Sequence, residues 1–183
     1  SQPTPFDLGF KLGPRINAGG RVGNASHGAE LLTSNDPQKT YKIAVDLDKS
    51  NKERQSIELL LSEKINSQVK NFHNYPVLVL SGNNWHEGII GIIASRIKEK
   101  YNKPTILISL NKDIGKGSAR SVSGFDIGTQ IIKAVQSNIL VKGGGHKMAG
   151  GFLIKKEKIQ LFRELLIKNY EKLNIDSSQN FNI

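Results

Sequence analysis

Four short stretches of the 183-residue sequence combine glycines with Ser, Arg, Lys or His side chains. They are residues 13–21 (GPRINAGGR), 82–88 (GNNWHEG), 115–121 (GKGSARS) and 143–146 (GGGH). Glycines let backbone N–H groups approach a phosphate closely, and hydroxyl and guanidinium groups add direct contacts to its oxygens. The chemistry that these residue types favour is therefore the binding of phosphate groups.

The third stretch is the clearest phosphate-binding candidate, because it places Lys116, Ser118, Arg120 and Ser121 close together among glycines. We expect it to be a loop at the carboxyl end of a strand, where ligands of α/β proteins usually bind. It is not a P-loop, since Gly117 follows Lys116 where that motif needs Ser or Thr. An ordinary turn with solvated charges is an equally good interpretation of this stretch alone.

His146 follows three consecutive glycines, Gly143, Gly144 and Gly145. A glycine triplet costs backbone entropy, so its position before a potential acid/base group indicates a geometric requirement. The alternative is a tight turn that ends in a surface histidine. For His86, beside Trp85, we favour a half-buried ring whose hydrogen bonds are satisfied within the fold.

The acidic residues show no pattern that could hold a metal ion. The sequence has no cysteine, no HExxH motif and no cluster of aspartates. Asp46 and Asp48 lie in a predicted helix, where residues two apart point to different faces. We therefore expect substrate-binding groups here, and neither a metal site nor a complete catalytic centre.

The composition favours a polyanionic partner. The net charge is +10, from 26 basic and 16 acidic residues, and such a surface attracts nucleic acid. A solvated, Lys-rich surface is the alternative. No apolar run could span a bilayer, and the first residues lack the basic and apolar regions of a signal peptide, so we expect a cytoplasmic protein without a membrane partner.

The N-terminal part is predicted to be helical after an ordered Gly/Arg loop at residues 13–21. Residues 26–32 form a short helix candidate within a first segment, residues 1–35. Asp36 and Pro37 are a good helix start signal, and no Gly or Pro follows until after Phe72. This predicts one long connecting helix over residues 36–73. Its polar part, residues 48–56, is typical of a helix that bridges two lobes.

In the second half, residues 75–173, predicted strands and helices alternate as in an α/β domain. Val- and Ile-rich runs predict buried strands, and the helix between the first two predicts a parallel βαβ unit. The fold class is therefore α/β, a small mixed sheet flanked by helices and preceded by the long helix. The predicted strands are 77–80, 105–110 and 152–154, the helices are 89–100, 125–136 (capped by Asp126) and 156–173, and the tail is 174–183.

The four stretches together resemble the RecJ family of 5′→3′ single-stranded-DNA exonucleases. Residues 13–21 are similar to its GPR-x-NAAGR signature, departing at Gly19, and residues 85–94 (WHEGIIGIIA) to its WH-x-GVIGIVA motif. Residues 115–121 with Gly124-Phe125-Asp126 resemble its GKGS-x-RS…GFD run, and residues 143–151 its GGH-x-MAAG motif, again with Gly for one Ala. Order and spacing match over about residues 7 to 165.

The resemblance implies an enzyme with a DHH phosphoesterase domain that holds two Mn²⁺ or Mg²⁺ ions, a long helix, a DHHA1 domain and an OB-fold domain. Residues 1–35 would end the DHH lobe, residues 75–173 would be the DHHA1 domain, and residues 174–183 would lead towards the OB fold. The DHH motif is not in this sequence, so we expect a fragment that is inactive alone. The implied role is DNA repair and recombination, with single-stranded DNA, the missing domains and other repair proteins as partners.

The resemblance also implies roles for individual residues. Ser118 and Arg120 would hold the 5′-end phosphate, and His146 would reach the scissile phosphate and stabilise its charge in the transition state. Arg15 and Arg21 would contact the strand backbone. The remaining members of the predicted DNA-binding set are Lys116, Ser121, Gly143, Gly144 and Gly145.

Two other classes of protein share part of this pattern. One is a nanoRNase or cyclic-dinucleotide phosphodiesterase with the same C-terminal domain type, and the other is a non-catalytic nucleic-acid-binding module such as the one that ends alanyl-tRNA synthetases. The GPR-x-NA signature and the long helix favour the RecJ-like interpretation over both.

Overall fold

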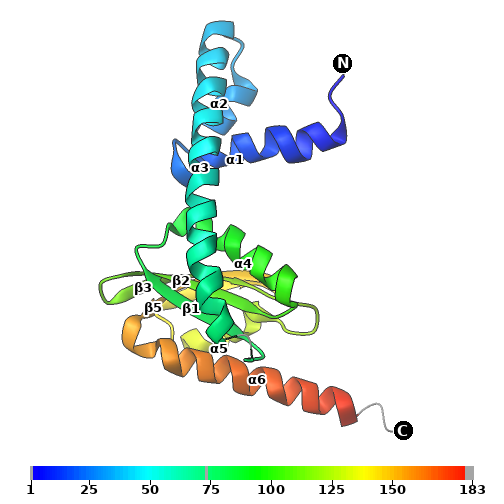
Figure 1. Cartoon of the computed structure of the whole chain (residues 1–183), viewed down its shortest axis with the longest axis vertical. Helices are drawn as coiled ribbons and strands as arrows, with labels where there is room; N and C mark the ends of the chain where they lie inside the picture. Colours follow the sequence, from blue (N-terminus) through cyan, green and yellow to red (C-terminus); the bar gives the residue numbers. More distant parts are fainter. Residues whose placement is uncertain (1, 73, 180–183) are drawn as a thin grey trace. The chain divides into compact units, whose positions relative to one another are not determined.

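The computed structural model describes residues 2–72 and 74–179, with side chains as far as residue 173. The chain divides into two compact units, Ser1–Leu60 and Leu61–Ile183. The boundary falls within the long helix α3 (Pro37–Phe72), which matches the predicted connecting helix and is labelled in Figure 1. Asp36 caps this helix, since its Oδ1 accepts hydrogen bonds from the Gln38 and Lys39 backbone N–H groups at 2.9 and 3.2 Å.

The first unit contains three further helical segments, and it corrects one prediction. Residues 13–21 are not a loop, because they form a regular α-helix. Pro14 suits the first turn of that helix. Gly19 is buried, and a Cβ atom there would lie 2.6 Å from the Asn24 carbonyl oxygen and 3.0 Å from the Leu47 side chain of α3. The glycine therefore serves close packing rather than a turn. The segments are the π-helical turn η1 (Asp7–Leu12), α1 (Gly13–Val22) and α2 (His27–Thr33).

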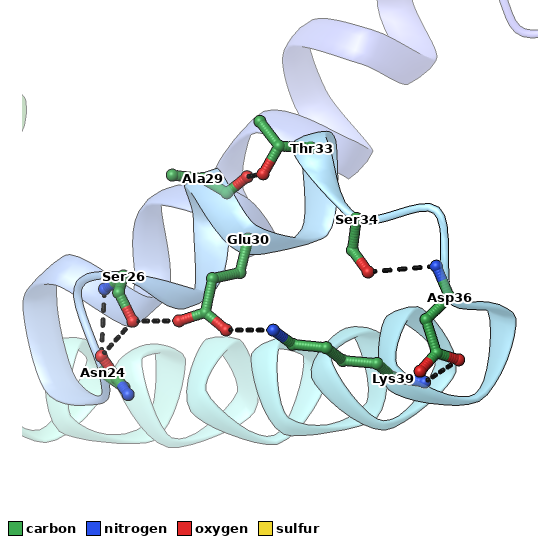
Figure 2. Close-up of polar contacts among 8 residues, drawn as sticks. All are labelled: Asn24, Ser26, Ala29, Glu30, Thr33, Ser34, Asp36 and Lys39. Atoms are coloured by element: carbon green, nitrogen blue, oxygen red, sulfur yellow. Dashed lines mark hydrogen bonds and ion pairs between the residues drawn. The ribbon is translucent and has the colours of Figure 1, made fainter.

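Exposed polar contacts lie where α2 meets the start of α3 (Figure 2). The Ser26 hydroxyl donates to Glu30 Oε1 at 2.5 Å, and the Lys39 ammonium lies 3.2 Å from Glu30 Oε2. These partners, first the Ser26 hydroxyl and then Lys39, lower the pKa of the Glu30 carboxyl. Exposed pairs of this kind add little stability.

The second unit is built on one five-stranded sheet in the order β1-β2-β3-β5-β4. β1 and β2 are parallel and are joined by α4 (Glu87–Tyr101), which confirms the predicted βαβ unit. All other neighbours are antiparallel, so the predicted small mixed sheet is also confirmed. The strands are β1 (Leu78–Asn83), β2 (Thr105–Asn111), β3 (Ile114–Arg120), β4 (Lys142–His146) and β5 (Ala149–Lys155).

Two glycine-rich stretches in which we predicted no strand are strands: the first was expected to be a loop, and the second had a tight turn as one interpretation. Residues 115–120 belong to β3 and residues 143–146 to β4. Gly115, Gly117 and Ala119 alternate towards the buried face, as the two-residue period of a strand requires. A Cβ atom at Gly117 would lie 2.1 Å from Phe152 Cζ, so this glycine leaves room for an aromatic ring.

Helices cover the sheet from both sides. In Figure 1, α4 and α6 (Ile159–Gln179) lie on opposite sides of it. Beneath α6 and α5 (Ile127–Gln136) lies the main core, where the rings of Phe152 and Phe162 meet edge to face at 5.0 Å. α6 follows a short 3₁₀ turn, η2 (Lys156–Lys158), and runs six residues beyond the predicted end at Leu173. The rest of the predicted tail, residues 180–183, lies outside the described residues.

No helix in the described part of the chain is both long enough and apolar enough to cross a bilayer.

The packing at Gly117 gives a prediction about stability. We expect Gly117→Ala to lower the free energy of unfolding by about 1–3 kcal/mol, because the added methyl must displace the Phe152 ring. Gly144→Ala is the matched control, since nothing lies within 4 Å of a Cβ atom at that strand position. It should be neutral or slightly stabilising. Urea unfolding measures both, and equal destabilisation by the two changes would contradict the packing described here.

Candidate functional site

α4 lies alongside β3, and four residues of the helix cover nearly the same distance as two residues of the strand. Four helix residues advance about 6.0 Å, and two strand residues advance about 6.6 Å. Three successive contacts result: Glu87 Oε2 with Lys116 Nζ at 2.8 Å, Gly91 beside Ser118, and Ser95 Oγ with Arg120 Nε at 3.1 Å. The predicted cluster of Lys, Ser and Arg is therefore spread along a strand and does not form one phosphate-binding loop.

Arg120 is held in place by neutral oxygens. Its Nε donates to Ser95 Oγ at 3.1 Å, and its Nη1 donates to Ser118 Oγ at 3.2 Å and to the Ala119 carbonyl at 2.8 Å. The close approach of α4 depends on Gly91, where a Cβ atom would lie 3.0 Å from both Arg120 Nη2 and Ser118 Oγ. The result is a half-buried guanidinium whose orientation is set by the fold.

The register of the sheet brings His146 onto the same face as Arg120. Residues directly opposite each other on antiparallel strands point to the same side. Three rows therefore cross β3, β5 and β4: Lys116–Leu153–Lys142, Ser118–Gly151–Gly144 and Arg120–Ala149–His146. We call this surface the three-row face. His146 lies two strands from Arg120, about 9.5 Å at the usual strand spacing.

The middle row has almost no side chains on β5 and β4. Nothing lies within 4 Å of a Cβ atom at Gly144, and at Gly151 the nearest atom is the Gly117 carbonyl oxygen at 3.7 Å. Because both glycines are exposed, the backbone itself forms the surface between Ser118 and the edge of the sheet.

The other two predicted glycines serve packing. A Cβ atom at Gly143 would lie 2.8 Å from Ile131 Cγ2 of α5, and one at Gly145 would lie 2.4 Å from the Ala149 carbonyl oxygen. Of the glycines before His146, Gly144 alone therefore belongs to the three-row face. Gly143 and Gly145 let β4 pack closely against α5 and β5.

Ser121 does not belong to this face. Its side chain is buried, its hydroxyl donates to the Phe125 carbonyl at 2.6 Å, and its backbone N–H donates to the Met148 carbonyl at 2.8 Å. The prediction that Ser121 contacts a phosphate is therefore wrong for its side chain. The residue instead fixes the loop that leads into α5.

The second glycine-containing stretch builds the start of α4. His86 Nδ1 accepts a hydrogen bond from the Gly88 N–H at 3.2 Å, so the imidazole is the N-cap of the helix. Trp85 is buried over Gly82, and its carbonyl accepts a hydrogen bond from the Ser109 hydroxyl at 2.5 Å. This agrees with the interpretation of His86 as a ring whose hydrogen bond is satisfied within the fold.

Sequence reasoning missed several contributors to the three-row face and its support. Glu87, Gly91 and Ser95 follow one another at four-residue helical spacing, which was visible in the sequence. Their contacts with β3 were not visible, because β3 was taken for a loop. Lys142 and Leu153 carried no motif signal, and only the strand register places them beside Lys116.

Arg15 and Arg21 lie in the first unit on α1. Arg15 Nε is 2.8 Å from Asp48 Oδ1, and its Nη1 donates to the Lys11 carbonyl at 2.8 Å. Lys52 first, and then Arg15, lower the pKa of the Asp48 carboxyl. Arg15 therefore has an anionic partner in Asp48. Arg21 is an exposed residue of the last turn of α1.

A divalent metal has no suitable ligand set in this part of the chain. Among the side chains described, those of residues 2–72 and 74–173, no three His, Asp or Glu residues come together as a metal site would require. The residues described here therefore do not fit a metal pair.

Residues 74–172 match the DHHA1 domain family. The chain is 38% identical over 173 residues to the single-stranded-DNA-specific exonuclease RecJ of Haemophilus influenzae, covering 90% of this chain and 30% of that relative. It is 33% identical to the Bacillus subtilis protein of the same name, covering 87% and 20% of the two chains. The fold is similar to RecJ from Thermus thermophilus in complex with Mn²⁺, with a TM-score of 0.81, 28% identity, and coverage of 91% of this chain and 24% of that one. The chain thus spans less than a third of the length of these relatives.

The capping carboxylate of α5 gives a prediction about pH. A hydrogen bond from the Thr129 backbone N–H lowers the pKa of the Asp126 carboxyl, so the cap stabilises the fold above the unfolded pKa of about 3.9. That stabilisation should be lost as the pH falls through the lower, folded-state pKa. Asn caps a helix about as well and does not titrate.

We therefore expect wild type to lose stability relative to Asp126→Asn below about pH 4, with a constant difference between pH 5 and pH 8. Urea midpoints across this range measure the effect. A difference that is the same at pH 3 and pH 7 would show that the carboxylate does not stabilise α5 through its charge.

Proposed function

This chain belongs to the DHHA1 domain family, and we propose that it is the substrate-binding part of a 5′→3′ single-stranded-DNA exonuclease of the RecJ type. The observation that carries the proposal is the fixed Arg120–Ser118 pair in line with His146 on one open face of the sheet. The similarity to single-stranded-DNA-specific exonucleases supports single-stranded DNA as the substrate class. The activity of a whole enzyme is part of the proposal, since this chain spans a minor share of each relative.

Arg120 and Ser118 would bind the 5′-terminal phosphate. A planar guanidinium matches phosphate oxygens in a way that an ammonium does not, and its position here is set by Ser95 and Gly91 before any ligand arrives. The cost of ordering this side chain is thus met by the fold rather than by the substrate. The Ser118 hydroxyl, 3.2 Å from Nη1, would add one more contact to the same phosphate.

His146 would contact the scissile phosphate and stabilise the charge that develops there. It is exposed at the end of β4, two strands from Arg120 in the same row, so both side chains can reach one substrate from two sides. Arg15 and Arg21 of α1 would contact the strand backbone. In this scheme the chain supplies position and positive charge.

The chemistry of cleavage would belong to a DHH domain outside this sequence that holds two Mn²⁺ or Mg²⁺ ions. Similar RecJ structures are described as complexes with Mn²⁺ and with Mg²⁺, which supports divalent ions for the family. We further propose DNA repair and recombination in the cytoplasm as the setting, with an OB-fold domain and other repair proteins as partners.

Binding of the 5′ end can be measured directly with single-stranded DNA that carries a 5′-phosphate or a 5′-hydroxyl, over a range of salt concentrations. We expect wild type to prefer the phosphorylated end by roughly tenfold or more, the factor that about 1.5–3 kcal/mol for a charged hydrogen bond would give. Arg120→Ala should abolish this preference.

Lys133→Ala, a change at an exposed position of α5, is the control with the same charge loss and should keep the preference. Unfolding of each variant shows whether the fold survives the loss of the Arg120 hydrogen bonds. Equal binding of both DNA ends by wild type would reduce the three-row face to a general polyanion-binding surface.

The proposal also expects the chain alone to be inactive. Incubation with single-stranded DNA and excess Mn²⁺ should leave the DNA intact, because the described residues offer no metal ligand set. A ladder of products that depends on His146 and Mn²⁺ would overturn this assignment of the metal centre to another domain.

A further inference from the structure

We propose that the row Lys116–Leu153–Lys142 is a second nucleotide subsite, which binds an internal phosphate and its base after the 5′-terminal phosphate has bound at Arg120. The inference rests on the proposed function and extends it. It assigns Lys142 and Leu153, neither of which the sequence motifs indicated, to substrate binding.

A hollow of about 550 Å³ lies over this row. It is open to solvent, with an ammonium group on each side and an apolar base between them. Leu153, in the middle of the row, is half-buried, so part of its side chain remains available for contact. The lining residues are Lys116, Gly117, Lys142, Gly143, Gly151, Phe152 and Leu153.

The Lys116–Lys142 row and the Arg120–His146 row are too far apart to bind the same phosphate. Lys142 and His146 are four residues apart on β4, which is about 13 Å of strand. On β3, the Lys116 ammonium is held by Glu87 at the start of α4, whereas Arg120 is held by Ser95 two turns later, about 12 Å along the helix. Two rows of cations at this separation fit two different phosphates of one strand.

The surface between the two rows suits a polynucleotide backbone. Gly144 and Gly151 place no side chain there, so a sugar and its phosphate can lie directly on the sheet. The strand would run along β4 and β3 from His146 towards Lys142, with its 5′ end at Arg120. Packing does not require glycine at these two positions, whereas it does at Gly117 and Gly143.

Lys142 is the principal cation of this subsite. Lys116 forms an ion pair with Glu87 in which both side chains are about half exposed, at 57% and 48%. Such a surface pair is weak and can exchange for a phosphate, but Glu87 reduces the net charge that Lys116 offers. Lys142 is exposed at the edge strand on the opposite side of the hollow.

The side chains that line the hollow do not distinguish one base from another. Its lining includes apolar carbons, backbone and two ammonium groups, but no amide or carboxylate side chain. Contact with Leu153 would bury part of a base without distinguishing one base from another. The ligand class is therefore any single-stranded polynucleotide with a phosphorylated 5′ end, without sequence preference.

The test is a set of double-mutant cycles between protein and DNA, measured as binding of 5′-phosphorylated oligonucleotides. In the DNA, one internal phosphate at a time, in the first few linkages, becomes a neutral methylphosphonate. In the protein, Lys142→Ala is compared with Lys133→Ala, which removes the same charge from α5. We expect Lys142→Ala to weaken binding by about fivefold at 0.1 M salt, the effect of losing one phosphate contact on a single strand.

At one internal linkage the methylphosphonate should cost much less in Lys142→Ala than in wild type, because the contact is already lost. Lys133→Ala should show the full cost at every linkage. Lys142→Ala should also keep the preference for a 5′-phosphate, which depends on Arg120. Additive effects at all linkages, or the same result for Lys142→Ala and Lys133→Ala, would overturn the second subsite.

The two proposals can fail separately. If Arg120→Ala abolishes the 5′-phosphate preference and Lys142→Ala couples to no linkage, the proposed function stands and the second subsite is rejected. If Lys142→Ala couples to a linkage while wild type ignores the 5′-phosphate, the three-row face binds DNA but not by its end. That second result would reject the order of subsites proposed here.

Discussion

The close approach of α4 to β3 is the constraint on which the candidate site depends. At Gly91 the helix comes so near the strand that a Cβ atom would lie 3.0 Å from the Ser118 hydroxyl and the Arg120 guanidinium. Because the helix and the strand advance by nearly equal amounts, each polar residue of β3 meets its own partner on α4. The strand thus presents oriented side chains, and α4, which lies against β2 and β3, leaves the face over β5 and β4 open.

Glycines have two distinct roles in this domain, and the structure separates them. Gly117 and Gly143 point towards the core, where Phe152 and Ile131 occupy the space that a side chain would need. Gly144 and Gly151 point the other way and leave backbone exposed. The first role concerns folding and the second concerns the substrate. Replacing a glycine of one glycine-rich motif can therefore either disturb the core or cover backbone that the substrate would contact.

The sequence predicted the elements whose signals are local. The Asp36 and Asp126 caps, the long helix and the parallel βαβ pair all follow from capping residues and apolar periodicity, and the structure has them. It did not predict β3, β4 or α1, since glycine has low strand and helix propensity and only tertiary packing compensates for it.

For the site, the motifs indicated Ser118, Arg120 and His146, but the arrangement of these residues needed the strand register. Ser121 was misassigned because sequence proximity to Arg120 says nothing about which way a side chain points once the strand has ended. Lys142 was passed over because a single lysine beside three glycines carries no signal without its neighbours across the sheet.

The most direct measurement is an NMR titration of backbone amides with a 5′-phosphorylated single-stranded oligonucleotide. If the three-row face binds the strand, the amide signals of Ser118, Gly144 and Gly151 should shift with a common dissociation constant. Those of α5 and α6, on the other side of the sheet, should stay in place. Shifts spread evenly over the basic surface, or concentrated on α5 and α6, would contradict the assignment of this face as the DNA-binding site.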